Sequence, residues 1–469
     1  MDLQIPTRGT DSRIMRIALG AIILFIAAVV LPPHANAQSA KGETQRRSFD
    51  PAPVVDSDDA TNVKATSQLM SAVRSMVYAE DFDRLDALAS AFRKNKSKFS
   101  GGMWKIHIFY GGTGPFGHAT EEDWKTLEGI LTRWVAAKPK SVTARVALAQ
   151  MYLGYAWSAR GGGFADSVSD SGWRLFESRV SQAKQALDSA KGLPEMCPEW
   201  YLVMQGIAID QSWTTESVDE LLKIAVSFEP GYYYYFRMHS LGLLPKWGGE
   251  PGEAEEFITQ SADRVGGAEG DILYFQLASF LVNQDRDAFR KLSFDRIRRG
   301  FTQSERVYGA SLTNMNLFAY MARLFDEAGV ANAVFNRIGD QWSEDLWHTK
   351  DAFDTGKKWA AELAEVFPDT SVIEEVMKTP EGRRFDAEFR TKFADLIQNC
   401  IGKADPAEGP ARLLAVVLED GTLSQLRSLR GNSKSVCLFQ TVHQKLSPPS
   451  RAPFKILLEF DIPVQPAPE

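Results

Sequence analysis

Residues 134–157, WVAAKPKSVTARVALAQMYLGYAW, decide the fold class of this chain. A first helical stretch ends at Pro139, and a second, rich in alanine and aromatic residues, follows directly. The same arrangement recurs in residues 192–210 and in residues 224–244. Proline ends a helix because it lacks an amide hydrogen and clashes with the preceding turn. The pattern therefore predicts a series of short antiparallel helices.

The spacing of these prolines points to irregular repeats. Pro198 and Pro230 are 32 residues apart, close to the tetratricopeptide period of about 34 residues, whereas Pro139 and Pro198 are 59 apart. A single helix pair cannot bury its own apolar face, so neighbouring pairs must stack to complete a core. We therefore predict a mainly α protein whose body is an irregular tetratricopeptide-like α-superhelix.

Apolar residues at a helical period of 3.6 extend this body over residues 67–365. Residues Leu69, Val73, Met76 and Val77 share one helix face. Thr120 and Asp123 have the spacing of a capping box at the start of a helix. Alternation of polar and apolar residues with period two is essentially absent from this range, which excludes an extensive sheet there.

The N-terminus has the layout of a secretory signal peptide, residues 1–37. Basic residues precede an uncharged run of fifteen residues, 17–31, and Ala35 and Ala37 form a small-x-small cleavage site. Cleavage after Ala37 predicts a periplasmic or secreted protein. The alternative is an uncleaved anchor, which would be the one attachment to a membrane, although this run is shorter than the ~20 residues of a spanning helix. Residues 38–66 read as a disordered leader.

Four consecutive tyrosines, Tyr232 to Tyr235, raise the choice between a ligand platform and a packed core. On a helix, successive side chains are about 100° apart, so four rings in a row point in four directions. A helix that is aromatic on all sides is enclosed by its neighbours. We interpret the tyrosines mainly as core, and leave open that one or two of them line a groove.

Three segments carry a resemblance to a known family. RGGGFADSVSDSGWRLF (160–176), EWYLVMQGIAIDQSW (199–213) and LLPKWGGEPGEAEEF (243–257) follow one another in the order seen in a bacterial helical-repeat family of unknown function. The similarity covers roughly residues 68–365. It implies a tetratricopeptide-like superhelix and supplies no activity.

The sequence pattern changes after a linker helix region, residues 366–384. The pattern that follows predicts a small α/β module over residues 385–469. Residues 385–400 read as one helix. Asp420-Gly421 follows the apolar run 413–418, and an Asp-Gly pair between strand-like runs is a strong hairpin signal, since both positions of such a turn need positive φ. Further on, the sequence predicts a helix over residues 433–446 and a strand over residues 454–462.

This hairpin–helix–strand order resembles the periplasmic C-terminal domain of TonB-type proteins. The resemblance covers about 60–80 residues, without the usual Tyr-Pro entry, the glycine before the first strand or a Pro-rich spacer. It implies a sheet whose edge accepts a strand from a partner.

Cysteine usage suits an exported protein. There are three cysteines, so at most one intramolecular pair can form. We predict a disulfide between Cys400 and Cys437, which lie within one small module, and a buried free thiol at Cys197. The disulfide would pin two helices to the sheet.

No catalytic constellation and no metal or cofactor motif is apparent. No two histidines are three or four residues apart, as a helical metal pair requires, and the acidic residues near His118 have the pattern of a helix N-terminus. Gly161-Gly162-Gly163 reads as a turn between helices, since no GK[ST] follows. If the helical body has a groove, its preferred lining consists of Trp157, Arg160, Trp173 and Trp247.

Composition narrows the function further. The chain is 44% hydrophobic and 24% charged with a net charge of −7, so nothing favours a nucleic-acid partner. We expect an exported, non-enzymatic scaffold that binds another periplasmic protein or envelope component. One alternative is an envelope enzyme with an unidentified site, in which ionisable side chains meet in one pocket; a meeting of His118, Asp166 and Arg160 would favour it. The other alternative is a membrane-anchored TonB-type energy transducer.

Overall fold

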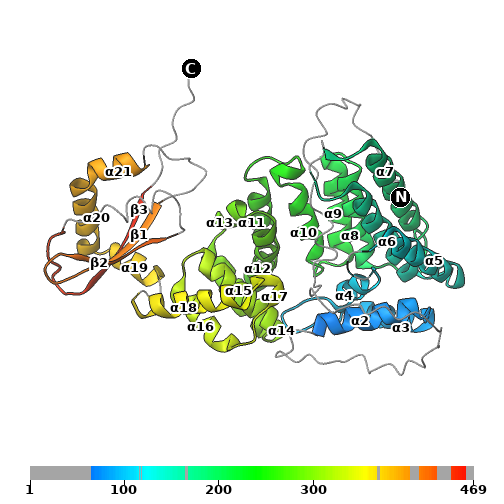
Figure 1. Ribbon diagram of the computed structural model, residues 1–469, viewed down its shortest axis with the longest axis horizontal. Helices are drawn as coiled ribbons and strands as arrows, with labels where there is room; N and C mark the ends of the chain where they lie inside the picture. Colours follow the sequence, from blue (N-terminus) through cyan, green and yellow to red (C-terminus); the bar gives the residue numbers. More distant parts are fainter. Residues whose placement is uncertain are drawn as a thin grey trace, which may run out of the picture. The chain divides into compact units, whose positions relative to one another are not determined.

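The computed structural model describes residues 65–115, 117, 119–163, 167–366, 370–401, 411–429 and 445–460. The described chain is mainly helical and carries a three-stranded antiparallel sheet near its C-terminus, as the sequence predicts (Figure 1). It divides into two compact units. Unit 1 extends to Gln284 and also contains Asp295–Asn314, and unit 2 contains Asp285–Phe294 and the chain from Met315 onward.

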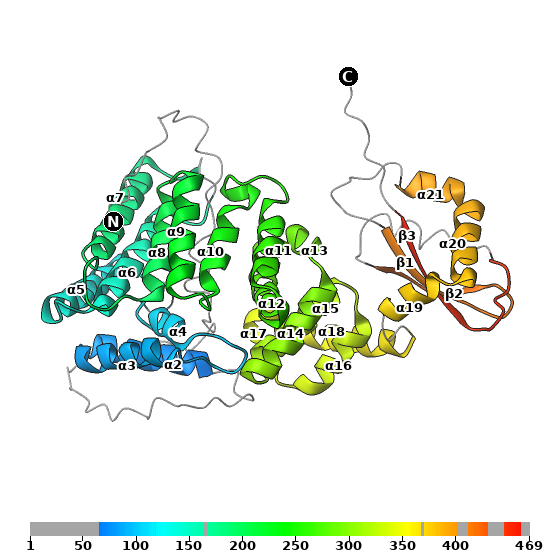
Figure 2. The same ribbon diagram turned by 180° about the vertical axis from the view of Figure 1, so that it is seen from behind.

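Unit 1 consists of helices connected by short turns. They are α2 (Ala65–Tyr78), α3 (Phe82–Asn95), α4 (Lys105–Gly112), α5 (Glu121–Ala137), α6 (Val142–Arg160), α7 (Asp170–Asp188), α8 (Pro198–Asp210), α9 (Thr215–Phe228), α10 (Tyr234–Gly242), the 3-10 turn η2 (Pro245–Trp247), α11 (Glu253–Val265), α12 (Gly267–Gln284) and α14 (Phe294–Tyr308). Helices that follow each other in the sequence lie side by side, for example α5 with α6, α6 with α7 and α11 with α12 (Figures 1 and 2).

Helix junctions in unit 1 follow local sequence signals. Thr120 and Asp123 form the predicted capping box at the start of α5, where each side chain bonds the backbone N–H of the other. Ser141 caps α6 by accepting a hydrogen bond from the N–H of Ala144 at 2.9 Å. Pro139 lies in the turn between α5 and α6, and Pro198 occupies the first turn of α8, where its missing N–H costs nothing.

The core of unit 1 is apolar and largely aromatic. The predicted stripe on α2 is buried throughout: Leu69, Val73, Met76 and Val77. Trp104, Phe109, Trp134 and Phe275 are among the largest side chains withdrawn from water. Because α8 buries most of its residues and α12 buries every residue of 270–282 except Asp271, they are central helices rather than amphipathic surface helices.

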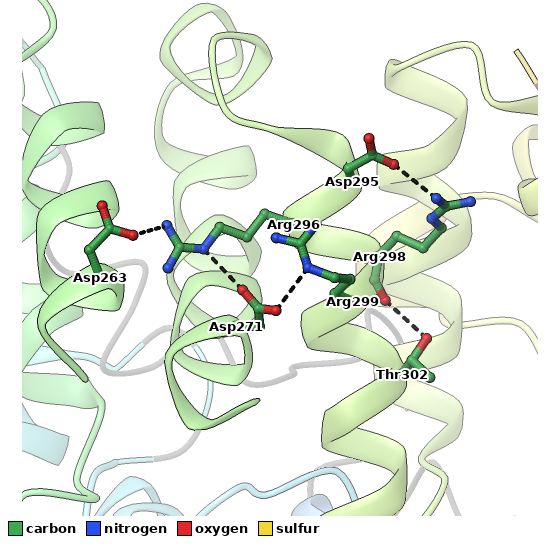
Figure 3. A network of polar contacts seen from close by, with 7 residues as sticks. All are labelled: Asp263, Asp271, Asp295, Arg296, Arg298, Arg299 and Thr302. Carbon is green, nitrogen blue, oxygen red and sulfur yellow. Dashed lines mark hydrogen bonds and ion pairs between the residues drawn. The ribbon is translucent and has the colours of Figure 1, made fainter. Parts of the chain in front are cut away.

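A network of ion pairs joins α11, α12 and α14 within unit 1 (Figure 3). Asp271 on α12 accepts hydrogen bonds from the Nε atoms of Arg296 at 3.1 Å and Arg299 at 2.9 Å. Arg296 also bonds Asp263 on α11 at 2.6 Å and lies over the ring of Tyr274. Arg296 and Asp271 are only 14% and 17% exposed, so water screens this pair less than a surface pair.

Close approach of α14 to α12 depends on Gly300. A β-carbon at this position would lie 2.0 Å from the backbone oxygen of Asp271 and 2.7 Å from the β-carbon of Phe275. These contacts are far below van der Waals separation, so only glycine allows the two helices to pack at this distance.

Unit 2 contains further helices and the sheet. Its helices are α13 (Arg286–Arg290), α15 (Leu312–Leu324, whose first residues belong to unit 1), α16 (Ala328–Ile338), α17 (Glu344–Trp347), α18 (Lys350–Val366), α19 (Thr370–Met377), α20 (Pro380–Lys392) and α21 (Ala394–Ile401). Trp347 packs against Phe335 and Phe353, and its indole N–H donates to the buried Asn316 side chain at 3.1 Å.

The sheet has strand order β2-β1-β3, with β1 (Ala411–Val417), β2 (Leu423–Leu429) and β3 (Phe454–Phe460). Both pairings are antiparallel. Leu413, Ala415 and Val417 face α20 and α21, whereas Leu414 and Val416 face α19. Because both faces are covered by helices, β1 reads as a continuous apolar run rather than an alternating one.

Two local predictions for this module are wrong in detail. Residues 385–400 are not one helix: α20 ends at Lys392, and α21 begins after the buried Phe393. The hairpin exists, but its connection spans residues 418–422, and of the Asp420-Gly421 pair only Gly421 has positive φ. The predicted helix at 433–446 lies outside the described residues apart from its last two positions.

Candidate functional site

The four tyrosines lie in the core of unit 1, as the sequence indicates. All of Tyr232 to Tyr235 are at most 6% exposed. However, α10 begins only at Tyr234, so Tyr232 and Tyr233 belong to the turn after Pro230 rather than to one continuous helix. Stacked rings join Tyr234 to Tyr233 and to His107, which places the tyrosines against α4.

A buried acid, Glu199, contacts two of these aromatic side chains, and the sequence analysis did not identify it. Glu199, on α8, is 1% exposed. Its carboxylate accepts a hydrogen bond from the Tyr232 hydroxyl and lies 3.1 Å from Nδ1 of His107. Burial, with Glu199 nearby, raises the pKa of Tyr232 far above its usual value. The phenol is therefore a permanent donor to Glu199 at physiological pH.

Cys197 is the predicted buried free thiol. Its sulfur lies 3.4 Å from the Tyr110 hydroxyl, in a fully buried site. Burial raises the pKa of the thiol, although Arg93 partly opposes this effect. A thiol that stays protonated and enclosed is a poor nucleophile, so Cys197 has the character of a structural residue.

The predicted groove residues Trp157, Arg160, Trp173 and Trp247 come together in unit 1, and we call them the Trp–Arg cluster. Trp157 and Arg160, on α6, are buried, whereas Trp173 on α7 and Trp247 on η2 are half-buried. The Arg160 guanidinium lies 5.2 Å from the ring centre of Trp157 and 5.4 Å from that of Trp173. The ring of Trp247 packs edge-on against that of Trp157, with 6.2 Å between the ring centres.

Asp210, the last residue of α8, is the acid of this cluster, and sequence reasoning missed it. Its Oδ2 accepts a hydrogen bond from the Trp157 indole N–H at 3.2 Å. Burial raises the pKa of Asp210 to about 8, because the Trp157 hydrogen bond and the Arg160 charge only partly offset the loss of water. Near neutral pH the carboxyl is therefore largely uncharged, and it does not neutralise Arg160.

A separate cavity of about 550 Å³ opens between α3, the α5–α6 turn and the segment before α8, all within unit 1. We call it the α3–α6 cavity. Prolines, alanines, hydroxyls and charged groups share its wall: Asp86, Ala87, Ser90, Arg93, Ala137, Lys138, Pro139, Lys140, Ser141, Val142, Thr143, Pro194 and Glu195. Pro139 and Pro194 both lie at helix junctions. They are the feature of the sequence that could have indicated this cavity.

Cations prevail in the α3–α6 cavity. Arg93 is held in place by Thr143 at 2.9 Å and by Glu195 at 2.8 Å. Lys138 and Lys140 add two more positive charges at the turn, and the Lys138 ammonium forms an ion pair with Asp83 on α3. Burial raises the pKa of the Asp86 carboxyl, although a hydrogen bond from Ser141 opposes this shift. The cavity thus offers a positive rim beside apolar surface.

Other predicted residues are placed only in part. Cys400 is buried at the end of α21 against the sheet, but Cys437 lies outside the described residues, so the disulfide stays a prediction. Ala35, Ala37, His118 and Asp166 also lie outside the described residues. The proposed meeting of His118 and Asp166 with Arg160 is therefore untested.

The described residues contain neither a cluster of potential metal ligands nor a helix suited to crossing a membrane. No group of three or more His, Cys, Asp or Glu side chains there has the arrangement of a metal site. Within the same residues, no helix combines the length and the apolar character needed to cross a membrane.

Comparison of the chain with protein-family models, curated proteins and solved structures finds no match in any of the three. The resemblances to a tetratricopeptide-like family and to TonB-type domains therefore stay predictions.

Proposed function

We propose that this protein is an exported, non-enzymatic scaffold that binds a protein or another envelope component through its helical unit. The observation that carries the proposal is the α3–α6 cavity. It is open, it is lined by α3 and by the α5–α6 and α7–α8 junctions, and it combines prolines and alanines with a cationic rim. An extended acidic segment of a partner matches that surface, because its carboxylates would meet Lys138 and Lys140 while its backbone lies along apolar residues.

The fine architecture belongs to the same proposal. A tetratricopeptide-like superhelix would repeat such junctions along the body. In a TonB-like module, an edge strand would accept a strand from a second partner; β2 and β3 are the edge strands among the described residues. Both roles require a partner in the cell envelope, so a periplasmic location is part of the same proposal.

The proposal is tested by selecting peptides from a displayed random library on the full-length protein. Ala87 is an exposed residue of the cavity wall, so Ala87→Trp fills the cavity without disturbing the core. We expect acidic peptides to be enriched and their affinity to fall at least about tenfold in Ala87→Trp.

The matched control is Ala268→Trp, which adds the same ring at an exposed position of α12. It should bind the selected peptides as the wild type does. Equal binding by Ala87→Trp and wild type, or a selection without acidic enrichment, would contradict the proposed site.

A further inference from the structure

Arg160 presents an unpaired hydrogen-bonding edge inside unit 1. Its Nη1 donates to the carbonyl oxygens of Gly161 at 3.0 Å and Gly163 at 2.8 Å, so the backbone after α6 orients the guanidinium. Its Nε and Nη2 are both buried and have no hydrogen-bond partner among the residues that the structure describes. These two nitrogens lie on the same side of the planar group, where they form the two-pronged edge that pairs with a carboxylate.

The surroundings hold this edge ready for a ligand. Trp157 and Trp173 pack against the guanidinium, and Arg160 is only 4% exposed, so the group has little freedom to turn away. A guanidinium stays charged even when burial lowers its pKa, as it does here. Leaving charged donors buried without acceptors is costly, which makes their pairing with an anion favourable.

The nearest acid does not fill this role. Asp210 uses Oδ2 to accept from Trp157, its Oδ1 has no hydrogen-bond partner, and no ion pair joins it to Arg160 among the described residues. Its raised pKa of about 8 leaves it mostly uncharged at neutral pH. The buried positive charge of Arg160 thus lacks a counter-ion in the described part of unit 1.

Neighbouring groups define what else the ligand would touch. The indole N–H of Trp247, on a ring that contacts Trp157, is a further buried donor without a partner in the described part of the chain. Phe176 adds an aromatic wall beside Trp157 and Trp173. Trp173 and Trp247 are half-buried, so part of each ring reaches the surface of unit 1, and we expect these rings to shift when a ligand enters.

We propose that the Trp–Arg cluster is a binding site for a carboxylate attached to an apolar or aromatic group, with the carboxylate bound side-on by Nε and Nη2 of Arg160. The carboxylate belongs either to a small molecule or to the C-terminus of a peptide. This site is distinct from the α3–α6 cavity, and it does not depend on what occupies that cavity.

The first test compares phenylacetate with phenylacetamide on the full-length wild-type protein, by ligand-observed NMR titration. The two molecules have nearly the same shape, and only the first carries a carboxylate. We expect phenylacetate to bind at least about tenfold more tightly. Equal affinities, or no binding of phenylacetate, would overturn the proposal. Because both ligands are titrated into the wild-type protein, the result does not depend on whether a variant folds.

The second test uses Arg160→Lys, which keeps the charge but loses the two-pronged edge. We expect phenylacetate affinity to fall about tenfold, whereas Ala87→Trp, at the other cavity, leaves it unchanged. Wild-type affinity in a folded Arg160→Lys variant, or loss of phenylacetate binding in Ala87→Trp, would refute the assignment to Arg160. Failure of the peptide selection at the α3–α6 cavity would leave these outcomes unaffected.

A third arm separates the two sources of the carboxylate. A short peptide ending in phenylalanine is titrated with a free and with an amidated C-terminus. Stronger binding of the free form than of phenylacetate identifies a peptide terminus as the ligand. Binding of phenylacetate together with weaker or no binding of the free peptide identifies a small carboxylate.

Discussion

At the scale of single residues, two tyrosines of the same run differ in the partner of their hydroxyl groups. Tyr232 and Tyr235 are both fully buried in unit 1. The Tyr232 hydroxyl donates to the carboxylate of Glu199, whereas the Tyr235 hydroxyl has no hydrogen-bond partner within the described ranges. A buried hydroxyl stabilises a fold only when it is paired, so the two phenol groups should contribute oppositely to stability.

We predict that Tyr232→Phe lowers the free energy of unfolding by about 1–3 kcal/mol, because it leaves a lone pair of buried Glu199 without its donor. Tyr235→Phe, the matched control, removes an unpaired hydroxyl and should be neutral or slightly stabilising. Urea denaturation followed by circular dichroism measures both. Equal losses in the two variants would contradict the hydrogen-bond account.

Asp210 makes stability depend on pH. Its folded pKa of about 8 is higher than that of an ordinary aspartate, near 3.9, because the carboxyl is buried. Below about pH 4 both states hold the proton. Between about pH 4 and pH 8 the unfolded chain releases a proton that the folded chain keeps, so this carboxyl makes the folded state less stable as pH rises.

Asp210→Asn removes this titration and can still accept from Trp157. We predict that the free energy of unfolding of the variant, minus that of the wild type, increases from pH 5 to pH 7 by up to about 1.4 kcal/mol per pH unit. Denaturation at several pH values measures this slope. Asp340→Asn makes the same change at an exposed carboxyl and serves as the control for the substitution itself. A flat difference for Asp210→Asn would place the pKa of Asp210 near its ordinary value.

At the scale of elements, helical periodicity was predictable because each helix buries one stripe or all of its surface. Boundaries set by local chemistry, such as the capping box at Thr120, were predictable too. The break at Phe393 was not, because both flanking segments are good helices and the break is decided by packing of Phe393 against the sheet. The start of α10 at Tyr234 is similar, since four identical residues carry no boundary signal.

The candidate sites were predictable to a different extent. The Trp–Arg cluster was chosen from the preference of recognition surfaces for arginine and tryptophan, and its members do come together. Asp210 was missed because nothing in its local sequence shows which helix it will face. The pairing of Arg93 with Glu195 joins residues 102 apart, and such contacts follow from helix stacking rather than from any motif.

An ion pair between helices should matter more than one within a helix. We predict that Asp271→Ala lowers the free energy of unfolding by about 1–3 kcal/mol, because it leaves the largely buried Arg296 and its neighbour Arg299 without their shared acceptor (Figure 3). Thermal and chemical denaturation measure the change.

The matched control for this network is Asp295→Ala, which removes a more exposed pair with Arg298 within α14. Its expected cost is below about 1 kcal/mol. A larger loss in Asp295→Ala than in Asp271→Ala would show that the network does not join the three helices energetically.

At the scale of the whole molecule, the two units differ in how they are stabilised. Unit 1 has a large aromatic core, whereas the sheet of unit 2 rests on two small apolar layers contributed by α19 on one face and by α20 and α21 on the other. A small layered module gains most from a covalent cross-link, since it buries little apolar surface.

We predict that the oxidised protein has a mass two protons below that of the all-thiol chain, with Cys400 and Cys437 in one linked peptide. Reduction should lower the free energy of unfolding of the module by about 3–4 kcal/mol for a loop of this length. Non-reducing mass spectrometry checks the linkage. Cys197, fully buried, should react with an alkylating reagent only after unfolding, and a rapidly alkylated Cys400 would rule the bond out.

The chain leaves unit 1 at Gln284, returns to it at Asp295 and leaves again after Asn314. Helix α12 packs against Gly300 of α14, and residues 285–294, which belong to unit 2, lie between these two helices in the sequence. During synthesis on the ribosome, the N-terminal portion stays incomplete until α14 has emerged from the exit tunnel. A chain truncated after residue 284 lacks α14 and cannot complete the core of unit 1. We therefore expect the truncated product to bind chaperones and to be degraded by proteases.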